Sequence, residues 1–205
     1  MKSSYIRILF VVVALIYSVQ SNDCSKCWNV GETKCCGNQT MTCPESSCMT
    51  ISERCTVDGI EHKTVRKTCG DNTTCGSCFS ISTNQGLTLR TSTQCRKGYK
   101  SNANLNYKIT CEALEKENGY WCPACYKNNS MDGCEATHTI NCKGAETACL
   151  EFRGVIQIAD GTVKKISVKG CIFGCGFGYI ALPGVKILTT KILTCTPAEK
   201  ISEED

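Results

Sequence analysis

The chain has 205 residues, 20 of them cysteine, and a formal net charge of +4. So small a net charge, with lysines and arginines scattered through strand-like segments instead of forming a basic stripe, argues against nucleic-acid binding. The cysteine content is typical of a disulfide scaffold.

Residues 1–21 have the pattern of a secretory signal peptide. Lys2 and Arg7 form a basic start, an apolar run of ten residues follows from Ile8 to Tyr17, and small residues before Asn22 suit cleavage. The run is roughly half as long as a bilayer helix, so we do not expect it to span a membrane. Loss of the two cations leaves a net charge near +2. Export to an oxidising compartment predicts that the cysteines are paired, and their even number permits this.

The cysteines form one ladder that occurs twice. In the first copy the steps are 3, 9, 7, 5, 21, 6 and 20 residues, and in the second they are 3, 9, 8, 7, 22, 4 and 20. The first ladder is Cys24, Cys27, Cys36, Cys43, Cys48, Cys69, Cys75 and Cys95, and the second is Cys122, Cys125, Cys134, Cys142, Cys149, Cys171, Cys175 and Cys195. The offset of 98 residues suits a duplicated small domain better than a solenoid repeat.

Each copy predicts β-hairpins rooted at its cysteines. Asp58-Gly59 and Asp160-Gly161 lie between β-rich runs, 10 and 11 residues after a cysteine, and this dipeptide favours a tight turn. A further hairpin is expected to turn at residues 84–86 in the first copy, and its counterpart near Pro183-Gly184 in the second.

The expected architecture is all-β and disulfide-rich, with two tandem domains. We assign residues 22–111 to the first domain and 122–196 to the second, and take 112–121 as a linker with at most one helical turn. Cores this small are marginal without disulfides. Residues 197–205 form a polar tail with neither an apolar span nor a lipid-anchor signal, so a secreted, extracellular product without a membrane anchor is expected.

From Cys24 to Cys195 the ladder resembles the three-finger (LU) domains of the urokinase receptor and lymphocyte surface antigens. More narrowly, the segments 118–125 (NGYWCPAC) and 142–149 (CKGAETAC) are similar to the start of the second domain in gamma-type phospholipase A2 inhibitors. Amphibian courtship-pheromone precursors have a similar arrangement. The chain departs from the family pattern at Cys95, which is followed by Arg96 where the family usually has a second cysteine, and it lacks a closing loop after Cys195.

The resemblance implies a disulfide pairing for each ladder. The implied bonds are Cys24–Cys48, Cys27–Cys36, Cys43–Cys69, Cys75–Cys95, Cys122–Cys149, Cys125–Cys134, Cys142–Cys171 and Cys175–Cys195. Spacing alone could not choose among the connectivities. Four cysteines remain, for which we suggest the bonds Cys35–Cys55 and Cys78–Cys111.

Catalytic and metal chemistry have weak support. Cys122-Pro-Ala-Cys125 resembles a thiol-oxidoreductase motif, but a turn-forming sequence follows where a helix would be needed, and its counterpart Cys24–Cys27 opens the other repeat as a structural pair would. Zinc would require reduced thiolates in an exported chain. His62 and His138 lie in no nucleophile motif. No cofactor, metal or catalytic residue is therefore expected.

The apolar stretch from Ile172 to Leu193 is the strongest candidate for binding. It contains more apolar side chains than a thin finger can readily bury, so it packs either against the rest of the protein or against a partner. The candidate contact residues are Phe152, Ile156, Phe173, Phe177 and Tyr179. Asn38, Asn72 and Asn128 begin sequons and are candidate glycosylation sites.

The sequence thus predicts a secreted protein that binds an extracellular protein without catalysis. The resemblance implies inhibition of a secreted phospholipase A2, by covering its active-site entrance or lipid-facing surface, in a homo- or hetero-oligomer. A pheromone-like signalling ligand of the same fold is the alternative, and a thiol oxidoreductase is a third hypothesis.

Overall fold

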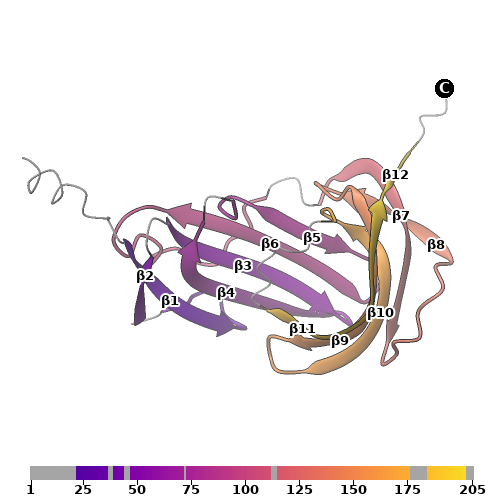
Figure 1. Ribbon diagram of the computed structural model, residues 1–205, viewed down its shortest axis with the longest axis horizontal. Coiled ribbons are helices and arrows are strands. Elements are labelled where there is room, and N and C mark those ends of the chain that lie inside the picture. Colours follow the sequence, from indigo (N-terminus) through magenta and orange to yellow (C-terminus); the bar gives the residue numbers. More distant parts are fainter. Residues whose placement is uncertain are drawn as a thin grey trace, which may run out of the picture.

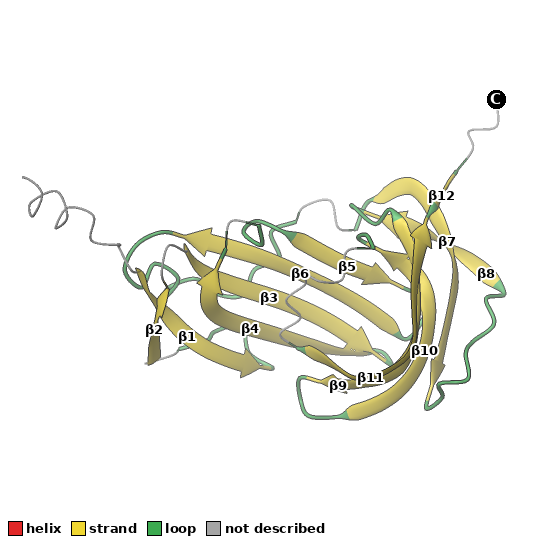
Figure 2. Ribbon diagram, in the orientation of Figure 1, coloured by secondary structure: helices red, strands yellow, loops and turns green. Residues whose placement is uncertain are grey.

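The computed structural model describes residues 22–36, 39–43, 47–71, 73–111, 115–175 and 184–201. The predicted signal peptide, residues 1–21, lies outside these ranges. All regular structure in the described part is β-strand, and Figure 2 shows strands joined by loops and turns. No helix in this part of the chain has the length and apolarity needed to cross a bilayer.

Twelve strands are described, six on each side of residue 112. The strands of the first half are β1 (Asn22–Val30), β2 (Gln39–Cys43), β3 (Ser47–Val57), β4 (Ile60–Gly70), β5 (Cys78–Ser82) and β6 (Leu87–Arg96). The strands of the second half are β7 (Glu117–Asn128), β8 (His138–Lys143), β9 (Ala148–Ile158), β10 (Val163–Ile172), β11 (Val185–Pro197) and β12 (Glu199–Lys200).

The two halves share one antiparallel sheet. Its order is β11-β9-β10-β5-β6-β3-β4-β1-β2, with β7 also pairing with β10 and carrying β8 and β12. The junction is the short ladder between β10 and β5, where Cys171 faces Ser82 and Ile172 faces Ile81. In Figure 1 the strands of the first half lie side by side as a broad layer, and β9, β10 and β11 turn steeply away from it. The sheet is therefore strongly bent at the junction.

The expected hairpins form in the described segments. The β3–β4 turn has positive φ at both Asp58 (51°) and Gly59 (80°), as a tight two-residue turn requires. The β9–β10 turn is longer: only Gly161 has positive φ, Gly161 N–H donates to Ile158 O, and the Asp160 carboxylate accepts from Thr162 N–H. The hairpins β1–β2, β3–β4 and β5–β6 are the three fingers of the first half. Residues 176–183, where the last predicted hairpin turns, lie outside the described residues.

Nine disulfides join 18 of the 20 cysteines in the described residues. Seven of the eight bonds that the family resemblance implied are present. The suggested Cys78–Cys111 bond is also present. The described strands and bonds together have the all-β, disulfide-rich three-finger organisation expected from the sequence.

Two expected bonds are wrong. Cys27 bonds Cys35 instead of Cys36, and the suggested Cys35–Cys55 bond is absent, which leaves Cys36 and Cys55 free. The two faces of the sheet explain why Cys35 does not bond Cys55. Cys27 lies opposite Lys67 in the β1–β4 ladder, and the Lys67 ammonium group bonds Cys35 O, so Cys27 and Cys35 share one face of the sheet. Cys55 faces the other side, where it is buried in the core.

The predicted linker 112–121 is shorter in the structure. Strand β7 already begins at Glu117, and the Asn118 side-chain amide donates to Gly144 O and Glu146 O, which fixes this segment to the β8–β9 connection. The predicted tail 197–205 likewise contains β12, which pairs with β7. The domain boundaries 22–111 and 122–196 remain our proposal.

The main hydrophobic core lies between the halves. Cys55, Val57, Phe79, Leu87 and Leu89 of the first half pack with residues of β9 and β10. The contributions of β9 and β10 are Ala148, Leu150, Phe152, Ile156, Ile158, Ile166, Val168 and Ile172. Each half also has a small cluster of buried cysteines at the base of its fingers. The disulfides thus stabilise the two bases, and apolar burial holds the two halves together.

Candidate functional site: the cavity between the halves

A cavity of about 360 Å³ lies inside the bend of the sheet. One wall is formed by Phe79 and Ile81 of β5 with Leu87 and Leu89 of β6. The opposite wall comes from β9, β10 and β11 and consists of Leu150, Phe152, Ile156, Ile166, Val168, Val185, Lys186, Ile187 and Leu193. Lys186 is the one polar side chain among these lining residues.

The mouth of this cavity lies along β11. The walls contributed by β5, β6, β9 and β10 are buried except for the partly buried Ile81, whereas Ile187 and Leu193 are 46% and 38% exposed. Ile187 stands opposite Ile156 and Leu193 opposite Phe152 in the β11–β9 ladder, so buried and exposed apolar side chains follow one another from the interior to the edge. The cavity therefore opens to solvent at the edge strand of the sheet.

A second hollow of about 590 Å³ continues from this mouth, because Val185 and Lys186 line both spaces. It is lined by Lys26, Cys27, Trp28, Gln39, Arg66, Lys67, Thr68, Val185 and Lys186. Lys26, Arg66 and Lys186 are exposed, and none of these three cations forms an ion pair within the described residues. The ammonium group of Lys67 donates hydrogen bonds to Cys35 O and Ala103 O, so it does not point freely into the groove. The apolar cavity thus leads into a basic groove.

Polar contacts between hairpin tips hold the two halves in this arrangement. Asp58, in the β3–β4 turn, accepts hydrogen bonds from the ammonium group of Lys164 and from Asn128 Nδ2 (2.8 Å). Asp160, in the β9–β10 turn, lies 3.7 Å from Nδ1 of His62. The Tyr126 ring packs on Gly86, where an added Cβ would come within 2.0 Å of it. Burial, with Asp58 as the next cause, raises the pKa of Tyr126.

A buried ion pair lies behind the cavity. Arg90 Nη1 is 3.4 Å from Glu146 Oε1, and the two side chains are 1% and 0% exposed. Ser82 Oγ donates to the same carboxylate oxygen at 2.7 Å, and Lys143 N–H donates to the other at 2.9 Å. Arg90 and Ser82 belong to the first half and Glu146 to the second, so this network also fixes the junction.

One buried carboxyl group has no such partner. Glu53 of β3 is fully buried, and neither of its oxygens accepts a hydrogen bond of normal geometry from the described residues. Burial raises the pKa of Glu53 to about 8, and the nearby backbone of Gly184 offsets part of this effect. Burial, together with Glu53, also raises the pKa of the neighbouring Cys55 thiol. The carboxyl group of Glu53 can therefore be neutral near physiological pH.

The predicted partner-binding residues divide into three groups. Phe152 and Ile156 are 5% and 3% exposed in the core between the halves, so their prediction as surface contacts is wrong. The first half covers them, which a reading of the second copy alone could not anticipate. Phe173 is 41% exposed and remains a candidate. Phe177 and Tyr179 lie outside the described residues.

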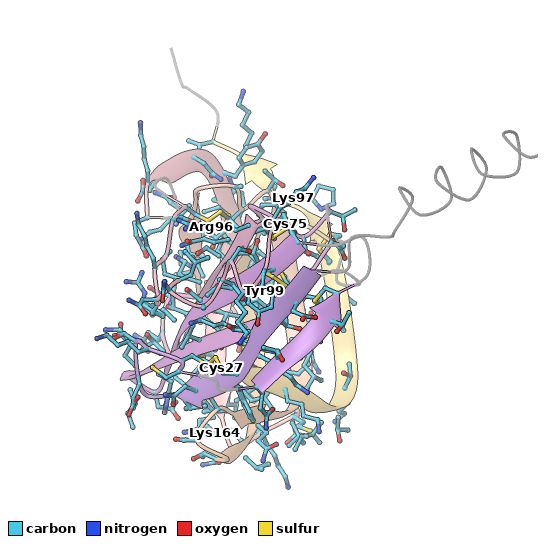
Figure 3. All side chains as sticks on the ribbon, turned by 90° about the vertical axis from the view of Figure 1, so that its left-hand side faces the viewer. Cys27, Cys75, Arg96, Lys97, Tyr99 and Lys164 are labelled. Carbon is cyan, nitrogen blue, oxygen red and sulfur yellow. A yellow bond between two sulfur atoms is a disulfide. The ribbon has the colours of Figure 1, made fainter. Side chains whose placement is uncertain are left out.

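Away from the hairpin tips, the described exposed apolar side chains are Trp28 on β1, Phe173 after β10, Ile201 near the end of the described residues, Tyr99 and three residues of β11. Ile187, Leu188 and Leu193 stand on β11, the edge strand. Tyr99 is 70% exposed in the loop after β6, with the Lys100 ammonium group 5.2 Å from its ring centre. In Figure 3 Tyr99 lies near the middle of the face that is turned to the viewer, with Arg96 and Lys97 beside Cys75 above it. The β11 patch lies at the cavity mouth.

The disulfide-bonded cysteines of the described residues have a structural role, and Cys36 and Cys55 are free thiols. Cys122 and Cys125 bond Cys149 and Cys134, so the Cys-x-x-Cys segment is not a redox dithiol pair. The sulfur atoms of Cys122, Cys142 and Cys171 lie within 4.8 Å of one another, but all three are in disulfides and offer no thiolate to a metal.

The sequon residues are only partly described. Asn38 and Asn72 lie outside the described residues. The Asn128 side chain is partly buried and donates to Asp58, so a glycan on Asn128 would stand at the contact between the halves. Glycosylation at all three positions stays a prediction.

The basic groove was missed by the sequence interpretation. Lys26, Arg66 and Lys186 belong to three different strands, and a scattered set of cations gives no local motif. The sequence shows only which residues of one strand share a face, because side chains alternate along a strand. The structure adds that Trp28 stands opposite Arg66 in the β1–β4 ladder, so both face the same side of the sheet.

The fold and the cavity define a disulfide-rich three-finger protein with an internal apolar site. No family model matches the chain. It is 27% identical over 157 residues to the phospholipase A2 inhibitor 31 kDa subunit of Naja kaouthia, a match that covers 75% of this chain and 80% of that protein. It is 25% identical over 173 residues to the phospholipase A2 inhibitor PIP of Malayopython reticulatus, a match that covers 83% of this chain and 81% of that protein.

These similarities confirm the resemblance that the cysteine ladder indicated. Among solved structures, mouse TEX101 matches 88% of this chain and 100% of its own at 16% identity and a TM-score of 0.36. A score this low carries no weight for the fold, which is defined here by the strand order and the disulfides.

Proposed function

We propose that this chain is a secreted binding protein that inhibits a phospholipase A2. One observation carries the proposal: several proteins named as phospholipase A2 inhibitors share 25–27% identity with it over about three quarters or more of its length. Identity at this level supports a common type of activity more strongly than a common target. The proposal involves no catalysis by the chain itself.

We assign the enzyme contact to the edge strand β11. Ile187, Leu188 and Leu193 are 38–46% exposed and give this edge strand an apolar character. Exposed apolar groups that cluster in this way are typical of protein contacts. An edge strand also offers backbone N–H and C=O groups to a partner. Phe173, which is 41% exposed, and Phe177 and Tyr179, which lie outside the described residues, stay candidate contacts.

The test uses purified protein and a panel of secreted phospholipases A2. Addition of the protein should slow phospholipid hydrolysis, and protein and enzyme should co-elute on size exclusion with light scattering, which also reports any homo- or hetero-oligomer. The double variant Ile187→Ser/Leu188→Ser should weaken inhibition at least tenfold. Ile60→Ser is the matched control, because Ile60 is 61% exposed at a different hairpin tip.

Two results would overturn the proposal. No inhibition and no co-elution at micromolar concentrations across the panel would remove phospholipase A2 as the partner. Equal loss of inhibition in the β11 double variant and in Ile60→Ser would remove β11 as the contact.

A further inference from the structure

The cavity between the halves has the properties of a ligand site instead of a packing defect. Native cores contain few voids larger than a water molecule, whereas this space is about 360 Å³. That volume falls in the range of roughly 300–1,000 Å³ that is usual for small-molecule sites. An apolar cavity of about 150 Å³ already stays dry and accepts an apolar guest. The lining of the space here is likewise apolar, so an apolar occupant that displaces water from it is favoured.

The chemistry of the entrance selects one kind of occupant. Among the described residues the interior is lined by apolar side chains alone, and the first polar group at the mouth is Lys186. Beyond it, Lys26 and Arg66 line the continuing groove without ion-pair partners among the described residues. Unpaired cations next to an apolar pocket complement a molecule with an apolar body and one anionic end.

We propose that the protein binds a single long-chain fatty acid, with its acyl chain between the halves and its carboxylate at Lys186. The chain would contact Leu89, Phe152 and Ile156 in the interior and pass Ile187 at the mouth. Lys26 and Arg66 would add to the positive potential around the carboxylate. This site goes beyond the proposed inhibition, since it needs no enzyme and can be tested on the protein alone.

The walls are held in place by contacts that do not involve the ligand. The Arg90–Glu146 pair and the Asp58–Lys164 contact join the halves behind and beside the cavity. The cavity should therefore persist in the free protein. Preformed pockets of this kind lose little free energy to reorganisation on binding.

The binding test uses the fluorescent C18 fatty acid cis-parinaric acid and the full secreted protein with its disulfides intact. We expect saturable 1:1 binding with a micromolar Kd. Palmitate should displace the probe, whereas hexadecyltrimethylammonium, with the same chain length and the opposite charge, should compete at least tenfold less well. Binding that ignores the sign of the head group, or no saturable binding up to 100 µM probe, roughly the weak end for a useful site, would overturn the proposal.

Two variants locate the site. Lys186→Glu should weaken palmitate binding about tenfold or more, whereas Lys191→Glu on the same strand should change it less than twofold, because Lys191 lies outside both cavities. Ile187→Trp should narrow the mouth and block the probe while preserving the fold, since Ile187 is 46% exposed. Equal effects of the two lysine substitutions, or unchanged binding in Ile187→Trp, would contradict the assigned position.

Discussion

Asp58, at the tip of the β3–β4 turn, accepts a hydrogen bond from the ammonium group of Lys164 on β10. In the opposite direction, Asp160 of the second half lies beside His62 of the first half. The four residues occupy equivalent positions in the two copies, because His62 follows Asp58 by four positions and Lys164 follows Asp160 by four. The two Asp-Gly hairpins therefore each contact the other half. Such reciprocity is typical of an isologous contact, formed here within one chain between its two cysteine-ladder copies.

The Asp58 contact should make a modest contribution to stability. Both side chains of the ion pair are partly exposed, and such pairs are worth up to about 1 kcal/mol. Asp58→Ala also removes the hydrogen bond from Asn128, so we expect a loss of about 1–2 kcal/mol in the free energy of unfolding by urea. Asp132→Ala is the control: its pair with Lys191 is far more exposed, and its loss should be below about 0.5 kcal/mol. Equal losses in the two variants would show that Asp58 does not tie the halves together.

The Arg90–Glu146 pair should be far more sensitive to substitution. Glu146→Ala leaves a buried guanidinium group without its carboxylate and should destabilise the protein by about 3–5 kcal/mol, measured as a lower urea midpoint. The joint substitution Arg90→Met/Glu146→Leu should recover much of this loss, because no uncompensated charge remains. Glu115→Ala, which removes an exposed carboxylate 3.4 Å from Arg90 Nε, should cost little. A large loss in Glu115→Ala and a small one in Glu146→Ala would reverse this assignment.

Glu53 should make stability fall as the pH rises. Its pKa is about 8 in the folded protein against an ordinary value of 4.5, so between these values the folded state binds more protons than the unfolded state. This difference removes about 5 kcal/mol of stability as the pH rises from 4.5 through 8, and the dependence levels off about one pH unit above 8. The isosteric Glu53→Gln variant should lack this dependence and be clearly more stable than the parent protein at pH 9. The same pH profile in both proteins, from melting temperatures at pH 5, 7 and 9, would contradict the assignment.

The sequence predicted the parts of the fold that depend on local chemistry. Asp58-Gly59 marks its turn because both residues adopt positive φ, and the repeated ladder fixes the finger bases. The position of one half on the other could not be predicted, because it depends on long-range pairing of β10 with β5. Phe152 shows the consequence. An apolar side chain such as Phe152 is expected either in the core or at a surface that binds a partner. The bend of the sheet buries Phe152 in the core between the halves, and the sequence does not show this bend.

The sequence also could not show whether Cys35 or Cys36 bonds Cys27. Cys36 lies nine residues after Cys27, the same step as in the second copy, whereas Cys35 lies eight residues after it, so the ladder favoured the wrong cysteine. The carbonyl of Cys35 accepts a hydrogen bond from buried Lys67 at 2.9 Å, and this contact keeps Cys35 beside Cys27. The basic groove could not be predicted for a different reason, since its cations come together only when β1, β4 and β11 line one space.

Thiol titration should distinguish the two free cysteines. Cys36 is exposed, so one equivalent of thiol per chain should react quickly with 5,5′-dithiobis(2-nitrobenzoic acid) in the native protein. Cys55 is buried and its thiol has a raised pKa, so the second equivalent should appear only after denaturation. Cys36→Ser should abolish the fast phase and Cys55→Ala the slow one. A native protein without any reactive thiol would mean that Cys36 and Cys55 are paired or blocked.

Gly86 should be essential for the contact between the halves. Its φ of +83° is unfavourable for any other residue except asparagine or aspartate, and an added Cβ would lie 2.0 Å from the Tyr126 ring. Gly59 has nearly the same φ, +80°, with nothing within 4 Å of an added Cβ, so Gly59→Ala measures the backbone cost alone, about 1–2 kcal/mol. Gly86→Ala should cost at least 2 kcal/mol more, because the ring must move and cannot do so without disturbing the junction. In urea unfolding the Gly86→Ala/Tyr126→Ala double variant should remove this excess. Equal losses in Gly86→Ala and Gly59→Ala would mean that Tyr126 does not hold the second half against this turn.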